Sequence, residues 1–365
     1  MNTFDEWKKL HDSGNLNVFN DDMEGVLWLK LKSIMRKDLV DALQEKLPCK
    51  ITAKKLPDIF KELFSCFASS PQTSHALLND FIHAESAKKS VDVNHLAEEL
   101  YKVRTFAWGG DYRNSLDKYL ISQYVKRISD YDAIMSKLEH EIPLAVHGYL
   151  MNSWYNHWTS ILIENIFHGH RVVVPGLGKI KNVDFFINDI PFDLKVTYFP
   201  AEFLKQQLKK TKQPSDISLL KKQAKQLNLI FSKTLDPTYE ILEKMEALST
   251  PVAKDAINEY HRRHNGIIDS VLENPRPLVQ WLYENQGEMR FSSENRLFLV
   301  LIDKKDFSSA WKLKRNLDLL SPKIISYLDD FHNKDINSLK VTFSYRPHSA
   351  RRFTALSDII FIIKE

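Results

Sequence analysis

The spacing of apolar residues predicts an all-helical N-terminal part. From residue 1 to about 140, apolar side chains recur at intervals of three and four, as in the runs 26–43 and 59–67. This spacing places one apolar stripe along the face of a helix. The sequence therefore predicts an all-helical domain over residues 1–140, with recognition or dimerisation as its expected role.

Strand patterns occur only in the second part of the chain. Six runs rich in β-branched and aromatic residues predict strands, at 171–174, 182–188, 192–197, 296–302, 339–345 and 358–364. Helices are expected at 151–167 and 308–331, with a helical insertion over about 205–290. This order of elements predicts a mixed α/β domain over residues 141–365, with a central mixed sheet flanked by helices.

Composition limits the class of protein. The chain has 365 residues, of which 43% are hydrophobic and 27% charged, so it can bury a core. No apolar run reaches the roughly 18 residues of a membrane span, and the acidic, aromatic start does not resemble a secretory signal. Cys49 and Cys66 are too few for a disulfide framework or a Cys-rich zinc site. We expect a soluble, cytoplasmic protein with no membrane partner.

Basic residues are concentrated in residues 201–235 and between the last two predicted strands. Residues 201–235 contain eight lysines against two acids, although the net charge is only +4. Such a run is either a solvated helix face or a surface that binds a polyanion. The candidate phosphate contacts are the positions nearest the strands, namely Lys205, Lys209, Lys210, Lys212, Arg346, Arg351 and Arg352.

The segment 182–197 predicts a β-hairpin, because turn-forming residues at 188–191 separate two strand runs. A tip at Asp189 and Ile190 would place Asn188 opposite Pro191. The position of the tip determines which residue of the first strand lies opposite each residue of the second strand.

In this register Asp184 lies opposite Lys195, and Phe186 lies opposite Asp193. Alternation along the strands then puts Asp184, Asp193 and Lys195 on one face. Two neighbouring carboxylates disfavour joint ionisation, and a divalent cation relieves this repulsion. Oxygen ligands of this kind suit Mg²⁺. The alternative is that the three residues form the wet face of an amphipathic hairpin.

A second acid pair has the same spacing without the hairpin. Glu294 precedes Asp303-Lys304-Lys305 by nine residues, as Asp184 precedes Asp193. No turn lies between them, so an extended chain would separate the two acids by about 30 Å. Only the pair at 184 and 193 is expected to meet.

The hairpin pattern resembles the PD-(D/E)xK nuclease superfamily, which includes the type II restriction endonucleases. That motif is an Asp, a spacer, and then Asp or Glu, any residue and Lys, on a hairpin preceded by an acidic helix. Asp184 and Asp193-Leu194-Lys195 match these positions, although Val183 stands where the motif name has Pro. Glu164 matches the supplementary acid on the helix, and it also fits a plain surface glutamate.

This resemblance implies a restriction-endonuclease-like core and a function. Asp184, Asp193 and Glu164 would bind Mg²⁺, and Lys195 would assist the attacking water. The partner would be double-stranded DNA, cut at specific sites by a homodimer. No nucleotide cofactor is expected, because the chain has no Walker loop. The alternatives are a repair, junction-resolving or modification-dependent nuclease, or a non-catalytic DNA-binding protein with a decayed nuclease fold.

Overall fold

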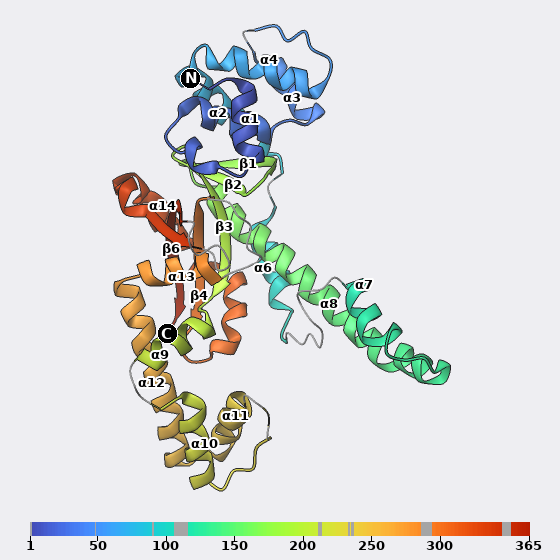
Figure 1. The fold of residues 1–365 in the computed structure, drawn as a ribbon, viewed down its shortest axis with the longest axis vertical. Helices are drawn as coiled ribbons and strands as arrows, with labels where there is room; N and C mark the ends of the chain where they lie inside the picture. Colours follow the sequence, from blue (N-terminus) through green and yellow to red (C-terminus); the bar gives the residue numbers. More distant parts are fainter. Residues whose placement is uncertain are drawn as a thin grey trace.

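A computed structural model describes residues 2–47, 49–89, 91–105, 116–210, 214–232, 234, 237–285, 294–344 and 352–365. A sheet occupies the middle of the elongated molecule (Figure 1). The N-terminal helices cover one end of it, a group of helices lies at the opposite end, and a helical arm projects sideways. None of the described helices combines the length and apolarity needed to cross a membrane.

The sheet contains six strands in the order β1-β2-β3-β4-β6-β5. They are β1 (Val173–Ile180), β2 (Val183–Ile187), β3 (Ile190–Tyr198), β4 (Arg296–Asp303), β5 (Lys340–Ser344) and β6 (Arg352–Lys364). β1, β2 and β3 form an antiparallel meander, β3, β4 and β6 run parallel, and β5 is antiparallel to β6. All six predicted strands are present, and the mixed α/β class is confirmed.

Helices cover both faces of this sheet. On one face, Ile163 and Phe167 of α8 (Tyr131–His168) and residues of α14 (Leu317–Asp329) pack against Phe185 and Leu299. On the other face, α9 (Ala201–Lys210), α12 (Pro251–Glu273) and α13 (Arg276–Asn285) pack against β4. With α10 (Asp216–Gln226) and α11 (Thr238–Leu248), these helices occupy the predicted insertion between β3 and β4.

The helix predicted over 308–331 is wrong as a single element. The chain forms a 3₁₀ helix η3 (Phe307–Arg315) and then α14, with short turns η4 (Phe331–Asn333) and η5 (Ile336–Leu339) after it. Asn316 separates the first two, because its side chain accepts a hydrogen bond from the Leu319 backbone N–H at 3.2 Å and begins α14.

The N-terminal part is helical, as predicted. Its helices are α1 (Phe4–Asp12), η1 (Leu16–Phe19), α2 (Met23–Ser33), α3 (Lys37–Gln44), α4 (Leu56–Ala68), α5 (Pro71–Ala87), α6 (Val93–Tyr101), α7 (Leu116–Leu120) and η2 (Ile121–Val125). Buried Trp7 and Trp28 lie in a core that also contains Val174 and Phe186 of the sheet. The expected domain boundary near residue 140 falls inside α8, which runs from the arm to the sheet without a break.

The two cysteines are paired. Cys49 and Cys66 form one disulfide within the N-terminal helices, 17 residues apart in sequence. The sequence predicted no disulfide framework, and a single bridge between α3 and α4 is what the described residues contain.

Residues 175–179, which include two glycines, lie within β1. The register of β1 against β2 shifts between Pro175 and Ile180, and Asn182 makes the turn with a φ of 60°. Glycine is needed here for close approach, since a Cβ on Gly178 would lie 2.5 Å from the Ser33 carbonyl oxygen. α2 can therefore pack directly against β1.

A buried lysine joins the N-terminal helices to the β2–β3 hairpin. Lys30 of α2 is fully buried and forms an ion pair with Asp189 at the hairpin tip. Its Nζ also donates to Asn79 Oδ1 at 2.7 Å and to His75 Nδ1 at 3.2 Å. The same ammonium lies 5.6 Å from the centre of the Phe186 ring. Asn79 and His75 belong to α5, and Asp189 and Phe186 belong to the hairpin, so Lys30 fixes the hairpin against α2 and α5.

The Lys30–Asp189 pair predicts unequal effects of its two single substitutions. Asp189→Ala leaves a buried ammonium without its anion and should lower the free energy of unfolding by about 2–3 kcal/mol. Lys30→Met leaves Asp189, whose side chain is 47% exposed, in contact with water. It should therefore lower the free energy of unfolding by only about 1 kcal/mol. Urea unfolding at pH 7 measures both values, and equal losses, or a larger loss for Lys30→Met, would contradict this account.

Candidate active site

The hairpin that carries the predicted acids has a two-residue turn. Asn188 and Asp189 form it, with φ angles of 45° and 67°, and Ile187 pairs with Ile190. Such left-handed turns match the twist of antiparallel strands, and Asn and Asp adopt them more readily than most residues. The predicted tip at Asp189 and Ile190 is therefore wrong, and the true register is displaced by two residues.

This displacement preserves the face on which the three charged residues lie. The observed pairs Phe185–Phe192 and Phe186–Pro191, continued by one residue, place Asp184 opposite Asp193 rather than opposite Lys195. A shift of two does not change which face a side chain occupies, because side chains alternate with a period of two. Asp184, Asp193 and Lys195 are therefore brought together.

Hydrogen bonds fix the orientation of both aspartates. The Leu194 backbone N–H donates to Asp184 Oδ2 at 2.8 Å, which directs the Asp184 side chain toward β3. Lys195 Nζ donates to Asp193 Oδ1 at 2.8 Å. The Asp193 side chain is only 9% exposed, whereas that of Lys195 is 45% exposed. The lysine thus reaches from solvent to a buried carboxylate.

Glu164 on α8 lies close enough to Asp184 for their charges to interact. Burial raises the pKa of Glu164 to about 7, and the negative charge of Asp184 contributes to the same rise. The helix therefore directs Glu164 toward the hairpin acids, although its apolar stripe lies elsewhere. Among the four residues with a predicted catalytic role, Glu164 is the one that comes from outside the hairpin.

The electrostatics of the two aspartates show competing effects. Burial raises the pKa of Asp184, while the hydrogen bond from Leu194 and the charge of Lys195 oppose that rise. Burial likewise raises the pKa of Asp193, and Lys195 opposes it through its charge and its hydrogen bond. The charge of Asp184 raises the pKa of Asp193 further. A cation placed between these carboxylates would favour the ionised form of both.

Two charged residues beside the site were not predicted from the sequence. β3 and β4 are parallel, and Asp193 pairs with Arg296. Arg296 Nε lies 3.9 Å from Asp193 Oδ2, and its guanidinium forms an ion pair with Glu294. Glu294 thus belongs to this neighbourhood through Arg296 and not through Asp303. Only the order of strands in the sheet brings these residues together, and no local sequence signal encodes that order.

Asn295 holds the strands at the level of the acids. Its carbonyl accepts a hydrogen bond from the Asp193 N–H at 2.9 Å, and its side-chain amide donates to the Pro191 carbonyl at 2.8 Å. Its Oδ1 accepts from the Leu356 N–H at 2.9 Å. One buried amide therefore connects β3, β4 and β6 next to Asp193.

The donors at this site suit a hard cation. In the described part of the chain, Asp184 Oδ1 receives no hydrogen bond, so that oxygen can act as a ligand. Mg²⁺ commonly takes one or two protein carboxylates and fills its remaining positions with water and phosphate oxygens. Asp184 and Asp193 could provide such a pair. Within the described residues, however, no group of three or more His, Cys, Asp or Glu side chains is arranged to hold a metal ion.

No family model, curated protein or solved structure matches this chain. The interpretation of the site therefore depends on its geometry and on the motif that its residues form.

The predicted phosphate contacts that the structure describes lie on two separate elements. Lys205, Lys209 and Lys210 are exposed on α9, which follows β3 directly. Arg352 begins β6 and is also exposed, but it pairs with Ser344 on the outermost strand. The remaining three positions, Lys212, Arg346 and Arg351, lie outside the described residues.

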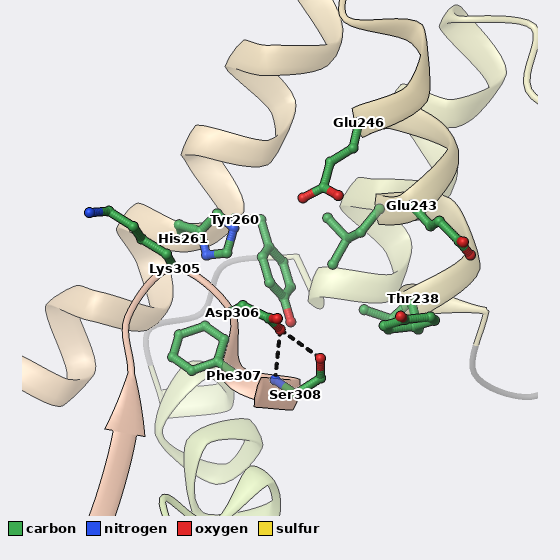
Figure 2. A pocket seen from close by; sticks show the side chains of 11 residues that line it. Thr238, Glu243, Glu246, Tyr260, His261, Lys305, Asp306, Phe307 and Ser308 are labelled. Carbon is green, nitrogen blue, oxygen red and sulfur yellow. Dashed lines mark hydrogen bonds between the residues drawn. The ribbon is translucent and has the colours of Figure 1, made fainter. Parts of the chain in front are cut away.

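A cavity elsewhere in the molecule contains a different set of polar groups. Its volume is about 450 Å³, and it lies between α11, α12 and the segment that follows β4. Figure 2 shows Tyr260, His261 and Asp306 around it. The Asp306 carboxylate accepts hydrogen bonds from the Ser308 backbone N–H at 3.1 Å and from its hydroxyl at 2.6 Å. Asp306 therefore begins η3, and the hairpin acids do not line this cavity.

The raised pKa of Glu164 predicts a pH-dependent stability. Its value of about 7 in the folded chain lies above the ordinary 4.5, so the folded state holds this proton more tightly than the unfolded state. Between these two values, the free energy of unfolding falls as the pH rises. Glu164→Gln removes the buried charge and should raise the free energy of unfolding by about 1–3 kcal/mol at pH 8, but not at pH 4.

Urea unfolding in EDTA at both pH values measures this effect. Glu139→Gln is the matched control, because Glu139 is exposed on the same helix. A Glu164→Gln variant that is no more stable than the wild type at pH 8 would show that the carboxylate is not held in this environment.

Proposed function

We propose that this protein is a Mg²⁺-dependent endonuclease that hydrolyses DNA at specific sites, similar to type II restriction enzymes. The observation that carries this proposal is the hairpin geometry. Asp184 and Asp193 oppose each other on neighbouring strands, and Lys195 occupies the same face. Glu164 on the preceding helix lies close enough to Asp184 for their charges to interact. These are the positions at which the chain resembles the PD-(D/E)xK motif.

Each residue has a role consistent with its environment. Asp184 and Asp193 would hold Mg²⁺, which acidifies water and stabilises charge on phosphate when it is bound. Lys195 is half-exposed and touches Asp193, so its ammonium can orient a water molecule and the scissile phosphate together. Glu164 is protonated to a large extent near neutral pH, and it can accept a proton when its pKa falls beside a cation.

The surroundings support a restriction-endonuclease-like core. The hairpin belongs to a mixed sheet with helices on both faces, and α8 leads into it. The lysines of α9 follow β3 immediately and could contact phosphates beside the acids. A two-fold DNA site would require a two-fold protein, so we propose a homodimer.

One observation favours a second candidate, a DNA-binding protein without catalysis. Asp193 is paired with Lys195 at 2.8 Å and lies 3.9 Å from Arg296, so its charge is compensated without a metal ion. A decayed nuclease fold could keep these ion pairs for stability alone. Repair, junction-resolving and modification-dependent nucleases share the chemistry of the first candidate and differ in their substrates.

Cleavage of DNA with Mg²⁺ and with EDTA tests the proposal. The wild-type protein should cut unmodified phage DNA into discrete fragments only when Mg²⁺ is present. Asp193→Ala should reduce the rate by at least about a thousandfold, because it removes a ligand of the ion that stabilises several kcal/mol of developing charge. DNA binding in EDTA should persist in this variant.

Asp41→Ala is the control, because Asp41 is exposed on α3, away from the sheet. Fragments without fixed ends would favour one of the other nuclease classes. Equal activity of Asp193→Ala and the wild type in every assay would favour the non-catalytic candidate and refute the nuclease.

A further inference from the structure

We propose that a second cleft, between α8, the end of β3 and η3, binds a phosphate and the adjacent base of the DNA strand a few nucleotides from the bond that is cut. This proposal rests on the proposed nuclease function and assigns the path of its substrate. We call this site the strand cleft. It has a volume of about 630 Å³, and its walls include Asn152, Asn156, Tyr198, Phe307, Trp311 and Lys314.

Lys314 gives the strand cleft its affinity for an anion. Its Nζ donates to Asn156 Oδ1 at 2.9 Å and lies 5.3 Å from the centre of the Tyr198 ring. Among the described residues, no carboxylate lies within ion-pair distance of Lys314. A half-buried ammonium without a counter-ion is unfavourable. A phosphate oxygen would supply both the missing charge and a further hydrogen-bond acceptor.

The burial of Lys314 has a measurable effect on its titration. Burial lowers its pKa to about 8, with no charged neighbour contributing. Tyr198 is the one other titratable group among the residues that line the strand cleft, and burial raises its pKa to about 12, so it stays neutral near pH 8. A bound phosphate would raise the pKa of Lys314 again, and binding should weaken as the pH rises above 8.

Aromatic side chains form the other walls of the strand cleft. Tyr198 is 38% exposed at the end of β3, and Trp311 of η3 is half-buried. Bases stack on exposed aromatic rings with little dependence on sequence. A lysine, amide groups and aromatic rings around one cleft are therefore suited to a nucleotide unit, in which a charged phosphate lies beside an aromatic base.

Two elements connect the strand cleft to the acids. On α8, Glu164 and Asn156 are eight residues apart, which is two turns or about 12 Å. Ser160 and Asn152 continue this spacing of four, and Asn156 Nδ2 donates to Asn152 Oδ1 at 2.8 Å. The stripe from Glu164 to Asn152 is therefore polar throughout.

β3 also leads from the acids toward the strand cleft. Its pairs with β2 extend only to Phe192, so from Asp193 onward β3 is paired on one side alone, with β4. Asp193 and Tyr198 are five residues apart, or about 17 Å, and this odd separation places Tyr198 on the face of β3 opposite to Asp193. The strand cleft therefore lies about 12 Å from Glu164 along α8 and about 17 Å from Asp193 along β3. These distances correspond to about four to five nucleotides at 3.4 Å per nucleotide of a duplex strand.

Binding of a fluorescein-labelled 20-base-pair duplex in EDTA tests this proposal, because it requires no cleavage. Lys314→Met keeps the apolar stem and removes the charge. Lys323→Met is the matched control, since Lys323 is exposed on α14 and is not part of the lining of the strand cleft. We expect Lys314→Met to weaken binding about three- to tenfold and to reduce the slope of log affinity against log salt by about one. The control should change the affinity and the salt slope by no more than about half as much as Lys314→Met does.

Tyr198→Leu is a second variant, and it should weaken duplex binding without changing the salt slope, since it removes stacking and not charge. Circular dichroism of each variant confirms that it is folded. Equal effects of Lys314→Met and Lys323→Met would overturn the proposal. Binding of adenosine monophosphate that depends on Lys314, with duplex binding unchanged, would also overturn it, since the site would then hold a free nucleotide.

These outcomes separate the two proposals. If the wild-type protein cuts DNA and Lys314→Met binds the duplex as tightly as its control does, the proposed role of the strand cleft is refuted and the proposed nuclease activity is supported. If the wild-type protein never cuts DNA but Lys314→Met selectively weakens duplex binding, the proposed role of the strand cleft is supported and the proposed nuclease activity is refuted. A wild-type protein that binds no duplex at any salt concentration refutes both.

Discussion

The opposition of Asp184 and Asp193 across the β2–β3 hairpin is the constraint on which the rest of the site depends. Both carboxylates are withdrawn from water, and burial raises the pKa of each. Such a pair persists in a folded protein only when surrounding groups compensate the lost hydration. Here the compensation comes from the Leu194 N–H on one aspartate and from Lys195 on the other.

The remainder of the fold holds the hairpin in this arrangement. Lys30 fixes the tip from α2, and Asn295 fixes the base from β4. Gly178 lets α2 approach β1, so the N-terminal helices share a core with the sheet. The N-terminal part therefore holds the hairpin in position through direct packing and one buried ion pair.

Much of this arrangement could be predicted from the sequence because strands have a period of two. That period placed Asp184, Asp193 and Lys195 on one face even though the predicted turn was displaced by one residue and the pairing across the strands by two. The turn itself was ambiguous, because Asn188, Asp189 and Pro191 all favour turns.

The features that the sequence did not predict depend on the order of strands and on the packing between distant elements. Arg296 and Glu294 reach Asp193 because β4 lies next to β3, although 103 residues separate Asp193 from Arg296. Lys314 meets Asn156 and Tyr198 because η3 packs between α8 and the sheet. Local periodicity does not encode either arrangement. It also does not show that Glu164 lies near Asp184, because this proximity depends on how α8 packs beside the hairpin.

The most direct test of the central claim is the location of a divalent ion in a crystal soaked in Mn²⁺, read from its anomalous scattering. Our account predicts one anomalous peak between β2 and β3, about 2.0–2.3 Å from an oxygen of Asp184 and from an oxygen of Asp193. Lys195 would then have moved away from the ion. Mn²⁺ at other positions only, with Asp193 still paired to Lys195 and Arg296, would contradict the account.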